Sequence, residues 1–418
     1  MHDAKAAHRI RVQIDRFSGN LCADLPKVSA RLVREVLYGV QARGSVRLSE
    51  IARSLGETVG LKKVIERLGR QLGRAGLRER LQSALLREAA RFVGADTLLV
   101  IDPTDLSKPY ARKMEHLAVV RDGSSGTRGP GYWSMTVVAT RRRSARIVPL
   151  YQELYSQEAP DFESENHQVL RAIETVAEAS GERGIWVMDR GGDRRRLLVP
   201  LLDRGRRFII RLRGDRHLLV DGHPASAFAI AASCRLPYRE TVVRQEPGGE
   251  QVWPLRFGAR AVRLPERPEA ALTLVVIEGP WATPLVLLTT LRPGRSRRSL
   301  WHLVEAYLAR WRVEEAIRFV KQSYRLEDIR LLRYERLRTM ITLVTAVAYF
   351  TAVVLGKRAR LRLLAEHLLR SAQRIYGIPE FRYYALADGI KQLLYSSQRG
   401  PSPPILRPGD QFLLLPFG

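Results

Sequence analysis

The sequence predicts a mixed α/β protein whose core is interrupted by a β-rich insertion and flanked by helical regions. Two short apolar runs, TLLVID at 97–102 and GIWVMD at 184–189, are typical of buried strands, and each ends in an aspartate. Between about 214 and 293 the helical pattern stops, Pro and Gly are frequent, and four strand-like segments follow one another. Regular helix returns at Ser299 and is expected to continue without a break past residue 320.

These changes of pattern divide the chain into five expected regions. They are a helical N-terminal region (1–93), the first part of an α/β core (94–213), the β-rich insertion (214–293), the second part of the core (294–355) and a C-terminal region (356–418) that could supply subunit contacts.

The N-terminal region has helical periodicity at 28–42 and 46–73, and the second stretch is interrupted at Gly56 and Gly60. This pattern is compatible with a helix-turn-helix DNA reader whose second helix carries Lys62, Lys63, Arg67 and Arg70. A plain helical bundle with a basic surface would give a similar pattern, so both interpretations stay open.

In the first part of the core, residues 132–140 and 145–154 read as strands of an antiparallel hairpin joined by the basic turn RRRS. A helix is expected over 166–180, followed by the strand 184–189, a helix-like segment and the strand-like RFIIRLRG. The apolar run 340–355 has 16 residues, fewer than the roughly 20 that cross a bilayer, and is expected to be a buried core helix.

The charge balance indicates a polyanionic partner. The 418 residues include 70 Lys+Arg against 43 Asp+Glu, a formal net charge of +27, and hydrophobic residues make up 45%, as in a folded protein. Basic residues are spread along the chain rather than gathered beside an apolar anchor, which favours nucleic acid over a membrane. The two cysteines exclude a disulfide framework, and the N-terminus has no apolar stretch of a signal peptide. We therefore expect a cytoplasmic protein, associated with the nucleoid if prokaryotic.

The segment YLARWRVEEAIRFVK at 307–321 places Tyr307, Arg310, Glu314 and Lys321 within an arc of about 60° on one helix. The stripe would be about 21 Å long, comparable to several steps along a nucleic-acid backbone. Ordinary salt bridging on a solvated face, with Glu314 paired to Arg310 or Arg318, would give the same pattern. A single acid among cations also suggests a metal or phosphate site.

Three carboxylates fit the chemistry of phosphodiester cleavage, which two divalent cations about 4 Å apart can support. Asp102 and Asp189 end buried strands, and Glu314 lies on the helix described above. Mg²⁺ prefers carboxylate and water ligands. Each aspartate could instead serve only to form a turn, and Asp189 could pair with Arg190. Three other acids are alternatives in the sequence: Asp105, Asp193 and Glu315.

The series TLLVIDPTDLSKPY, GIWVMDRGGD and YLARWRVEEAIRFVK resembles the three carboxylate blocks of DDE transposases of the IS4 type. The last block matches that family's Y-(2)-R-(3)-E-(6)-K signature at all four positions. The resemblance covers about 95–355 and implies a ribonuclease-H-like core interrupted by the insertion. Outside that span the match is loose.

The resemblance implies roles for individual residues. Asp102, Asp189 and Glu314 would hold two Mg²⁺ ions, for which Mn²⁺ can substitute, while Tyr307, Arg310 and Lys321 would position phosphates. Trp253 and Trp281 are candidates for stacking on a flipped base, although an ordinary core role is the more common one for a tryptophan in such a position. Further DNA contacts are expected from Arg211, Arg213 and Arg318.

The function expected on this basis is a cut-and-paste DNA transposase of an insertion sequence, acting on double-stranded DNA at terminal inverted repeats and on target DNA. The resemblance also implies a homodimer in the DNA complex. Two alternatives remain in the sequence: a non-catalytic DNA-binding regulator or domesticated transposase, and a ribonuclease-H-like nuclease with another substrate. The first would bind DNA with steep salt dependence and ignore divalent metal.

Overall fold

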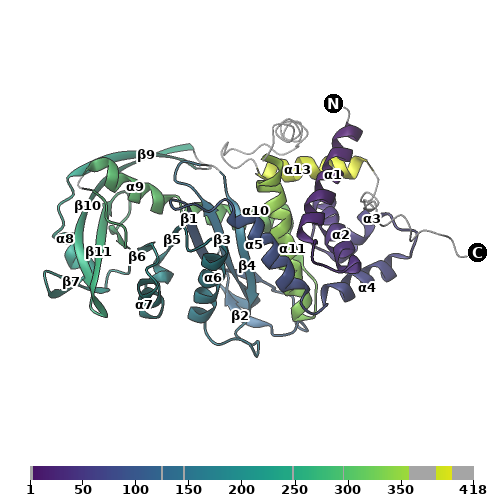
Figure 1. The fold of residues 1–418 in the computed structure, drawn as a ribbon, viewed down its shortest axis with the longest axis horizontal. Coiled ribbons are helices and arrows are strands. Elements are labelled where there is room, and N and C mark those ends of the chain that lie inside the picture. The colour runs from purple at the N-terminus through teal and green to yellow at the C-terminus, as the bar shows by residue number, and fades with distance from the viewer. Residues whose placement is uncertain are drawn as a thin grey trace, which may run out of the picture.

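The computed structural model describes residues 3–123, 126–144, 146–246, 249–294, 296–356 and 383–397. Figure 1 shows three parts side by side, with the insertion on the left, the core sheet in the centre and the N-terminal helices on the right. The protein is mixed α/β with helices at both ends of the chain, which confirms the predicted fold class.

The described residues before the first strand form five helices: α1 (Asp3–Leu21), α2 (Lys27–Arg43), α3 (Leu48–Leu55), α4 (Leu61–Leu72) and α5 (Leu77–Ala90). The turn expected between α3 and α4 is present, and Gly56 adopts a φ of 61°, which a glycine tolerates without strain. Lys62 and Lys63 are exposed at the start of α4. Arg67 instead pairs with Glu35 at 2.7 Å and Glu57 at 2.6 Å, so it contributes to packing between these helices.

The core sheet has a mixed strand pattern around β1 (Leu98–Ser107). On one side β1 pairs antiparallel with β3 (Arg128–Thr140), which also pairs with β4 (Val148–Tyr155) and, at the edge, β2 (Ala118–Arg121). On the other side β1 runs parallel to β5 (Ile185–Met188), and β5 runs parallel to β6 (Phe208–Arg211). Helices α6 (Glu165–Ala179) and α7 (Arg195–Asp203) supply the parallel crossovers.

The insertion continues the core sheet instead of forming a separate one. Its elements are β7 (His217–Val220), β8 (His223–Ser226), α8 (Ala227–Ala232), β9 (Tyr238–Glu246), β10 (Gly249–Leu264), β11 (Arg267–Glu278) and β12 (Leu285–Thr289). Strand β12 pairs antiparallel with β6, so the order over the described strands is β2-β3-β1-β5-β6-β12-β11-β10-β7-β8, with β4 on β3 and β9 on β10. The strands of the β-rich segment therefore extend the sheet that contains β1, β5 and β6.

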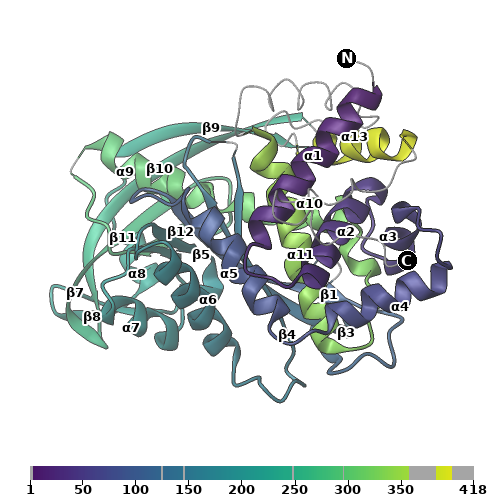
Figure 2. The same ribbon diagram turned by 45° about the vertical axis from the view of Figure 1, so that its right-hand side comes forward.

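The chain then forms α9 (Arg297–Leu308), α10 (Trp311–Ser323), α11 (Tyr334–Ala352) and α13 (Tyr383–Ser396). The apolar run expected in the core lies in α11, and nearly all of that helix is buried. Helix α11 packs against β4 and α5 on one side and against the N-terminal helix α2 on the other (Figures 1 and 2). In the described ranges no helix is both long and apolar enough to span a bilayer. Most of the expected C-terminal region, 357–382 and 398–418, lies outside the described residues.

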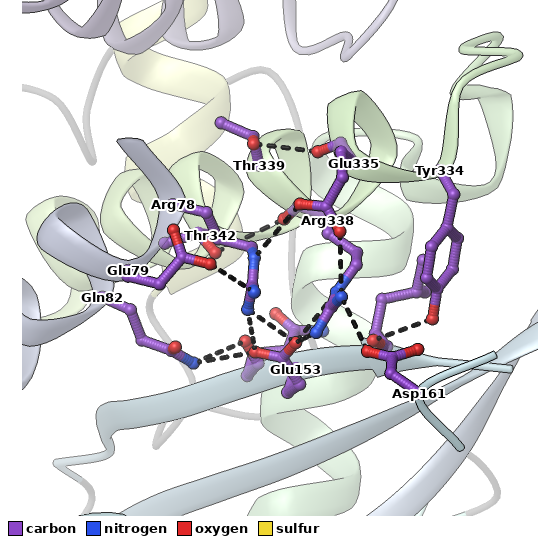
Figure 3. A network of polar contacts seen from close by, with 12 residues as sticks. Arg78, Glu79, Gln82, Glu153, Asp161, Tyr334, Glu335, Arg338, Thr339 and Thr342 are labelled. Carbon is purple, nitrogen blue, oxygen red and sulfur yellow. Dashed lines mark hydrogen bonds and ion pairs between the residues drawn. The ribbon is translucent and has the colours of Figure 1, made fainter. Parts of the chain in front are cut away.

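A buried ion cluster joins three of these parts (Figure 3). Glu153 of β4 is 3% exposed and accepts hydrogen bonds from Arg78 of α5, at 2.7 Å, and from Arg338 of α11, at 2.5 Å. Arg338 also pairs with Asp161 and Glu335. Since each buried charge has an oppositely charged partner, the cluster fixes α5 and α11 against the sheet.

Candidate active site

Two aspartates lie side by side because β1 and β5 are parallel neighbours. Val100 is opposite Val187 in the register, and Asp102 and Asp189 each follow two residues later on their own strands. Strand β1 does not end at Asp102 as the sequence suggested, since residues up to Ser107 still pair with β3. Strand β5 pairs with β1 only as far as Val100, so from there the edge of β1 is free of its parallel neighbour.

Asp189 is held by a local turn. Its Oδ1 accepts a hydrogen bond of 2.7 Å from the backbone N–H of Gly191, at the start of the short 3-10 helix Arg190–Gly192. A Cβ at Gly191 would lie 2.9 Å from that same oxygen, so a glycine is needed for the close approach. Asp189 therefore does form a turn through Oδ1, as one interpretation of the sequence predicted. The same hydrogen bond fixes the carboxylate at the end of β5.

The expected continuous helix through the 307–321 segment is wrong, because it is broken between α9 and α10. Around Arg310 the backbone makes i to i−3 hydrogen bonds: Arg310 N to Tyr307 O, Arg312 N to Ala309 O and Val313 N to Arg310 O. Tyr307 therefore ends one helix, Glu314 lies in the first turn of the next, and Arg310 stands at the junction. The residues form a corner instead of a straight stripe.

At this corner the Arg310 guanidinium lies between two of the acids. Its Nη2 donates to Glu314 Oε1 at 2.7 Å, and its Nη1 is 4.0 Å from Asp102 Oδ2. Tyr307 is 5% exposed and adjoins both Arg310 and Arg211 at the end of β6. Burial raises the pKa of Tyr307 against the opposing effect of these two arginines, so the phenol stays protonated at neutral pH.

The charges of the three acids act on one another. Burial, followed by the negative charge of Asp189, raises the pKa of Asp102 to about 7; Arg310 opposes the shift and Glu314 adds to it. The structure thus brings Asp102, Asp189 and Glu314 into one electrostatic neighbourhood in which negative charge is only partly balanced. Such a site favours the binding of a further cation.

The carboxylates as they stand do not form a finished metal site. Within the described residues no group of three Asp, Glu, His or Cys side chains is close enough to hold an ion. Glu314 is directed to Arg310, and its side chain is 47% exposed. The donor set nevertheless suits a hard divalent cation, because it consists of carboxylate oxygens with excess negative charge. Asp102 and Asp189 are the natural first ligands, and Glu314 would join them on releasing Arg310.

Two other members of the predicted set lie apart from this corner. Lys321 Nζ is 3.0 Å from Glu327 and 3.5 Å from Asp105, toward the far end of β1. Arg318 pairs with Glu315 at 2.5 Å on the exposed side of α10. Neither cation contacts the acids of the corner in this structure.

The acids that the sequence left as alternatives have partners elsewhere. Asp105 accepts from the Gly123 N–H in addition to pairing with Lys321. Asp193 is 1% exposed; it accepts from Arg216 Nε at 2.6 Å and from the backbone N–H of Arg213. The Arg213 side chain is 60% exposed, while its backbone is fixed by that bond.

Trp253 is buried, and both neighbouring indoles meet it edge to face. It is 8% exposed, with ring centroids 5.4 Å from Trp281 and 5.4 Å from Trp311. Trp311 is the first residue of α10, so Trp253 connects the insertion to the helix that carries Glu314. Sequence reasoning missed Trp311, although its position directly after Arg310 in the signature segment was a usable signal. Trp281 is the more accessible of the two stacking candidates.

Most of the chain matches a known protein family. Residues 94–351, more than half of the chain, match the family model described as "Transposase DDE domain". No curated protein matches the chain. A piggyBac transposase synaptic complex with hairpin DNA is similar among solved structures, at 12% identity over 86% of this chain and 76% of that one, with a TM-score of 0.44.

Proposed function

The chain belongs to the transposase DDE domain family, and from this premise we propose that it cuts and joins DNA at the terminal inverted repeats of an insertion sequence by a cut-and-paste route. The single observation that carries the proposal is the corner formed by Asp102, Asp189 and Glu314 around Arg310. A chain that only bound DNA would gain nothing from three mutually repelling acids beside a phosphate site.

We assign the divalent-ion ligands to Asp102, Asp189 and Glu314, with Mg²⁺ as the expected ion and Mn²⁺ as a substitute. When bound, such ions activate an oxygen nucleophile and stabilise the leaving oxygen. The protein's own cations would do the positioning. Arg310 presents a planar guanidinium that can bind a phosphate in place of the Glu314 carboxylate. Arg211 and Tyr307 lie next to it and would contact the same strand.

The partner in this proposal is double-stranded DNA, both as element ends and as target, and we propose a homodimer that holds two ends together. The net charge of +27 supports a DNA partner, because neutralised phosphates release counterions. Lys321 would reach DNA only by leaving Asp105 and Glu327.

The decisive experiment uses two adjacent glutamates as a matched pair. The purified chain is incubated with labelled duplexes carrying the inverted repeats that flank its gene, with Mg²⁺, with Mn²⁺ or with chelator. We expect end cleavage with either ion, its loss in Glu314→Gln and its retention in Glu315→Gln. Glu315 lies on the same helix but pairs with Arg318.

Each other result has a defined meaning. Cleavage that survives Glu314→Gln rejects the proposed site. Tight, salt-sensitive DNA binding with no cleavage under any divalent ion supports a non-catalytic regulator, whereas cleavage of an RNA–DNA hybrid in preference to the repeats supports a nuclease of another substrate class.

A further inference from the structure

A groove between α4 and the segment before α11 lies outside the corner described above and has no assigned role. It has a volume of about 670 Å³, and its lining includes four arginines, Arg70, Arg330, Arg333 and Arg336, against one acid, Glu66. Two parts of the chain that are more than 250 residues apart supply these arginines. Arg330, Arg333 and Arg336 come from one basic stretch of the sequence, and the fold brings Arg70 of α4 beside them.

Three of the four arginines form no ion pair with the described residues. Arg333 pairs with Glu115, whose other oxygen accepts from the Tyr334 N–H at 2.8 Å. For Arg70, Arg330 and Arg336, the described part of the chain has no acid within ion-pair distance. These arginines therefore present a cluster of uncompensated positive charge.

The wall of the groove is shaped to receive an arginine side chain. A Cβ at Gly73 would lie 3.3 Å from Arg336 Nε, and one at Gly69 would lie 3.7 Å from its Nη1. Arg336 therefore lies along α4 beside Gly69 and Gly73, and it lines the same groove as Arg70.

The chain leads from Asp102 along β1 to Lys108, which contacts the segment before the groove. Lys108 Nζ, at the end of β1, donates to the carbonyl of Ile329 at 3.1 Å, directly before Arg330. Asp102 and Lys108 are six residues apart along β1, which corresponds to about 20 Å at the rise of a strand. That is roughly six phosphate steps along one DNA strand.

We propose that Arg70, Arg330 and Arg336 form a second binding surface for the backbone of duplex DNA, separate from the cleavage site. This inference rests on the proposed function for its partner, because the same duplex would contact both places. Guanidinium groups bind phosphates without reading bases, so the surface adds affinity and orientation but no sequence preference.

The test measures the salt dependence of binding to a duplex of about 30 base pairs, in chelator so that no cleavage occurs. Each phosphate contact contributes about 0.9 to the slope of log K against log salt concentration. The triple variant Arg70→Gln/Arg330→Gln/Arg336→Gln should lower the slope by about 2 to 3 and weaken binding on the order of 10²-fold near 0.1 M salt. Replacing the same three residues by lysine should keep the slope.

Arg235→Gln is the matched control, because Arg235 is exposed in the insertion and likewise has no ion-pair partner in the described ranges. It should leave the slope unchanged. An unchanged slope in a folded triple-glutamine variant overturns the inference. The inference is also overturned if the triple-glutamine variant keeps its DNA binding but no longer binds a fluorescent polyglutamate peptide. That result would assign the groove to an acidic protein segment. The outcome is independent of cleavage, so failure of the catalytic proposal is recognised separately.

Discussion

The substitution Asp102→Asn should stabilise the metal-free protein while abolishing cleavage. The pKa of the Asp102 carboxyl group is raised to about 7, mainly by burial and further by the negative charge of Asp189, and Arg310 offsets only part of this rise. The ionised form of Asp102 is therefore less stable in the folded protein than in the unfolded chain. Asparagine has almost the same shape and no charge, so it removes this penalty and leaves the packing in place. Residues placed for function often cost stability in this way.

The magnitude follows from the shift. The pKa rises from 3.8 to about 7, and each unit corresponds to about 1.4 kcal/mol, which gives a ceiling of about 4 kcal/mol. We expect about 3 kcal/mol for asparagine because its amide is also desolvated. With an unfolding entropy of about 2.1 cal/mol/K per residue, this corresponds to a rise in Tm of about 3 °C for a chain of this length.

The sign of the pH dependence is fixed by the direction of the shift. The folded pKa lies above the unfolded one, so the favourable contribution of Asp102 is complete below about pH 4 and is lost as the pH rises through 7. The advantage of the asparagine variant should therefore be full at pH 8 and less than half as large at pH 5. Thermal unfolding of both proteins in chelator at the two pH values measures it.

Two comparisons make the experiment selective. Asp193→Asn removes an acid that accepts from Arg216 Nε at 2.6 Å, so it should destabilise the protein instead. Added Mn²⁺ should raise the Tm of the wild type and not that of Asp102→Asn. An asparagine variant that is no more stable at pH 8, or equally more stable at both pH values, would refute the reasoning.

Three further predictions concern the frame around the site. Glu153→Gln leaves two buried arginines without their anion and should lower the free energy of unfolding, measured in urea, by about 3 to 5 kcal/mol. Glu79 belongs to the same cluster but its side chain is 56% exposed, so Glu79→Gln should lower it by under about 1 kcal/mol. Trp253→Ala should lower the free energy of unfolding by about 3 to 5 kcal/mol and slow end cleavage, because the start of α10 loses its packing against this ring. Trp253→Phe should restore most of the stability and most of the cleavage rate. Equal cleavage rates for the wild type and both variants would exclude a positioning role. Burial lowers the pKa of Lys108 to about 8 in the folded protein. Between pH 8 and 10 the unfolded chain therefore binds one more proton than the folded chain, and the free energy of unfolding rises with pH. Lys108→Met should lack this rise in thermal unfolding experiments, and a pH profile identical to that of the wild type would contradict the prediction.

The sequence was sufficient for the broad fold because its signals are local. The apolar runs at 98–101 and 185–188 became the parallel strands β1 and β5, and the Pro- and Gly-rich stretch became the strands that extend the sheet past β6. The break between α9 and α10 was not predictable from those signals. No Gly or Pro marks it, and tightening of the backbone by i to i−3 bonds at Arg310 leaves no trace in residue type.

Choosing among the acids was also beyond the sequence, because the choice depends on long-range charge compensation. The buried acids of the described chain, Glu35, Asp105, Glu153 and Asp193, each have a cation within 3.5 Å. Asp102 has its nearest ion-pair partner at 4.0 Å and lies in the field of two other acids. Folding gives each of these four acids a nearby cation, whereas the negative charge of Asp102 is only partly balanced. This difference distinguishes Asp102 from Asp105, three residues away. The cations that pair with Asp105, Glu153 and Asp193 come from distant elements, so only the fold could reveal that Asp102 is the acid with incomplete charge compensation.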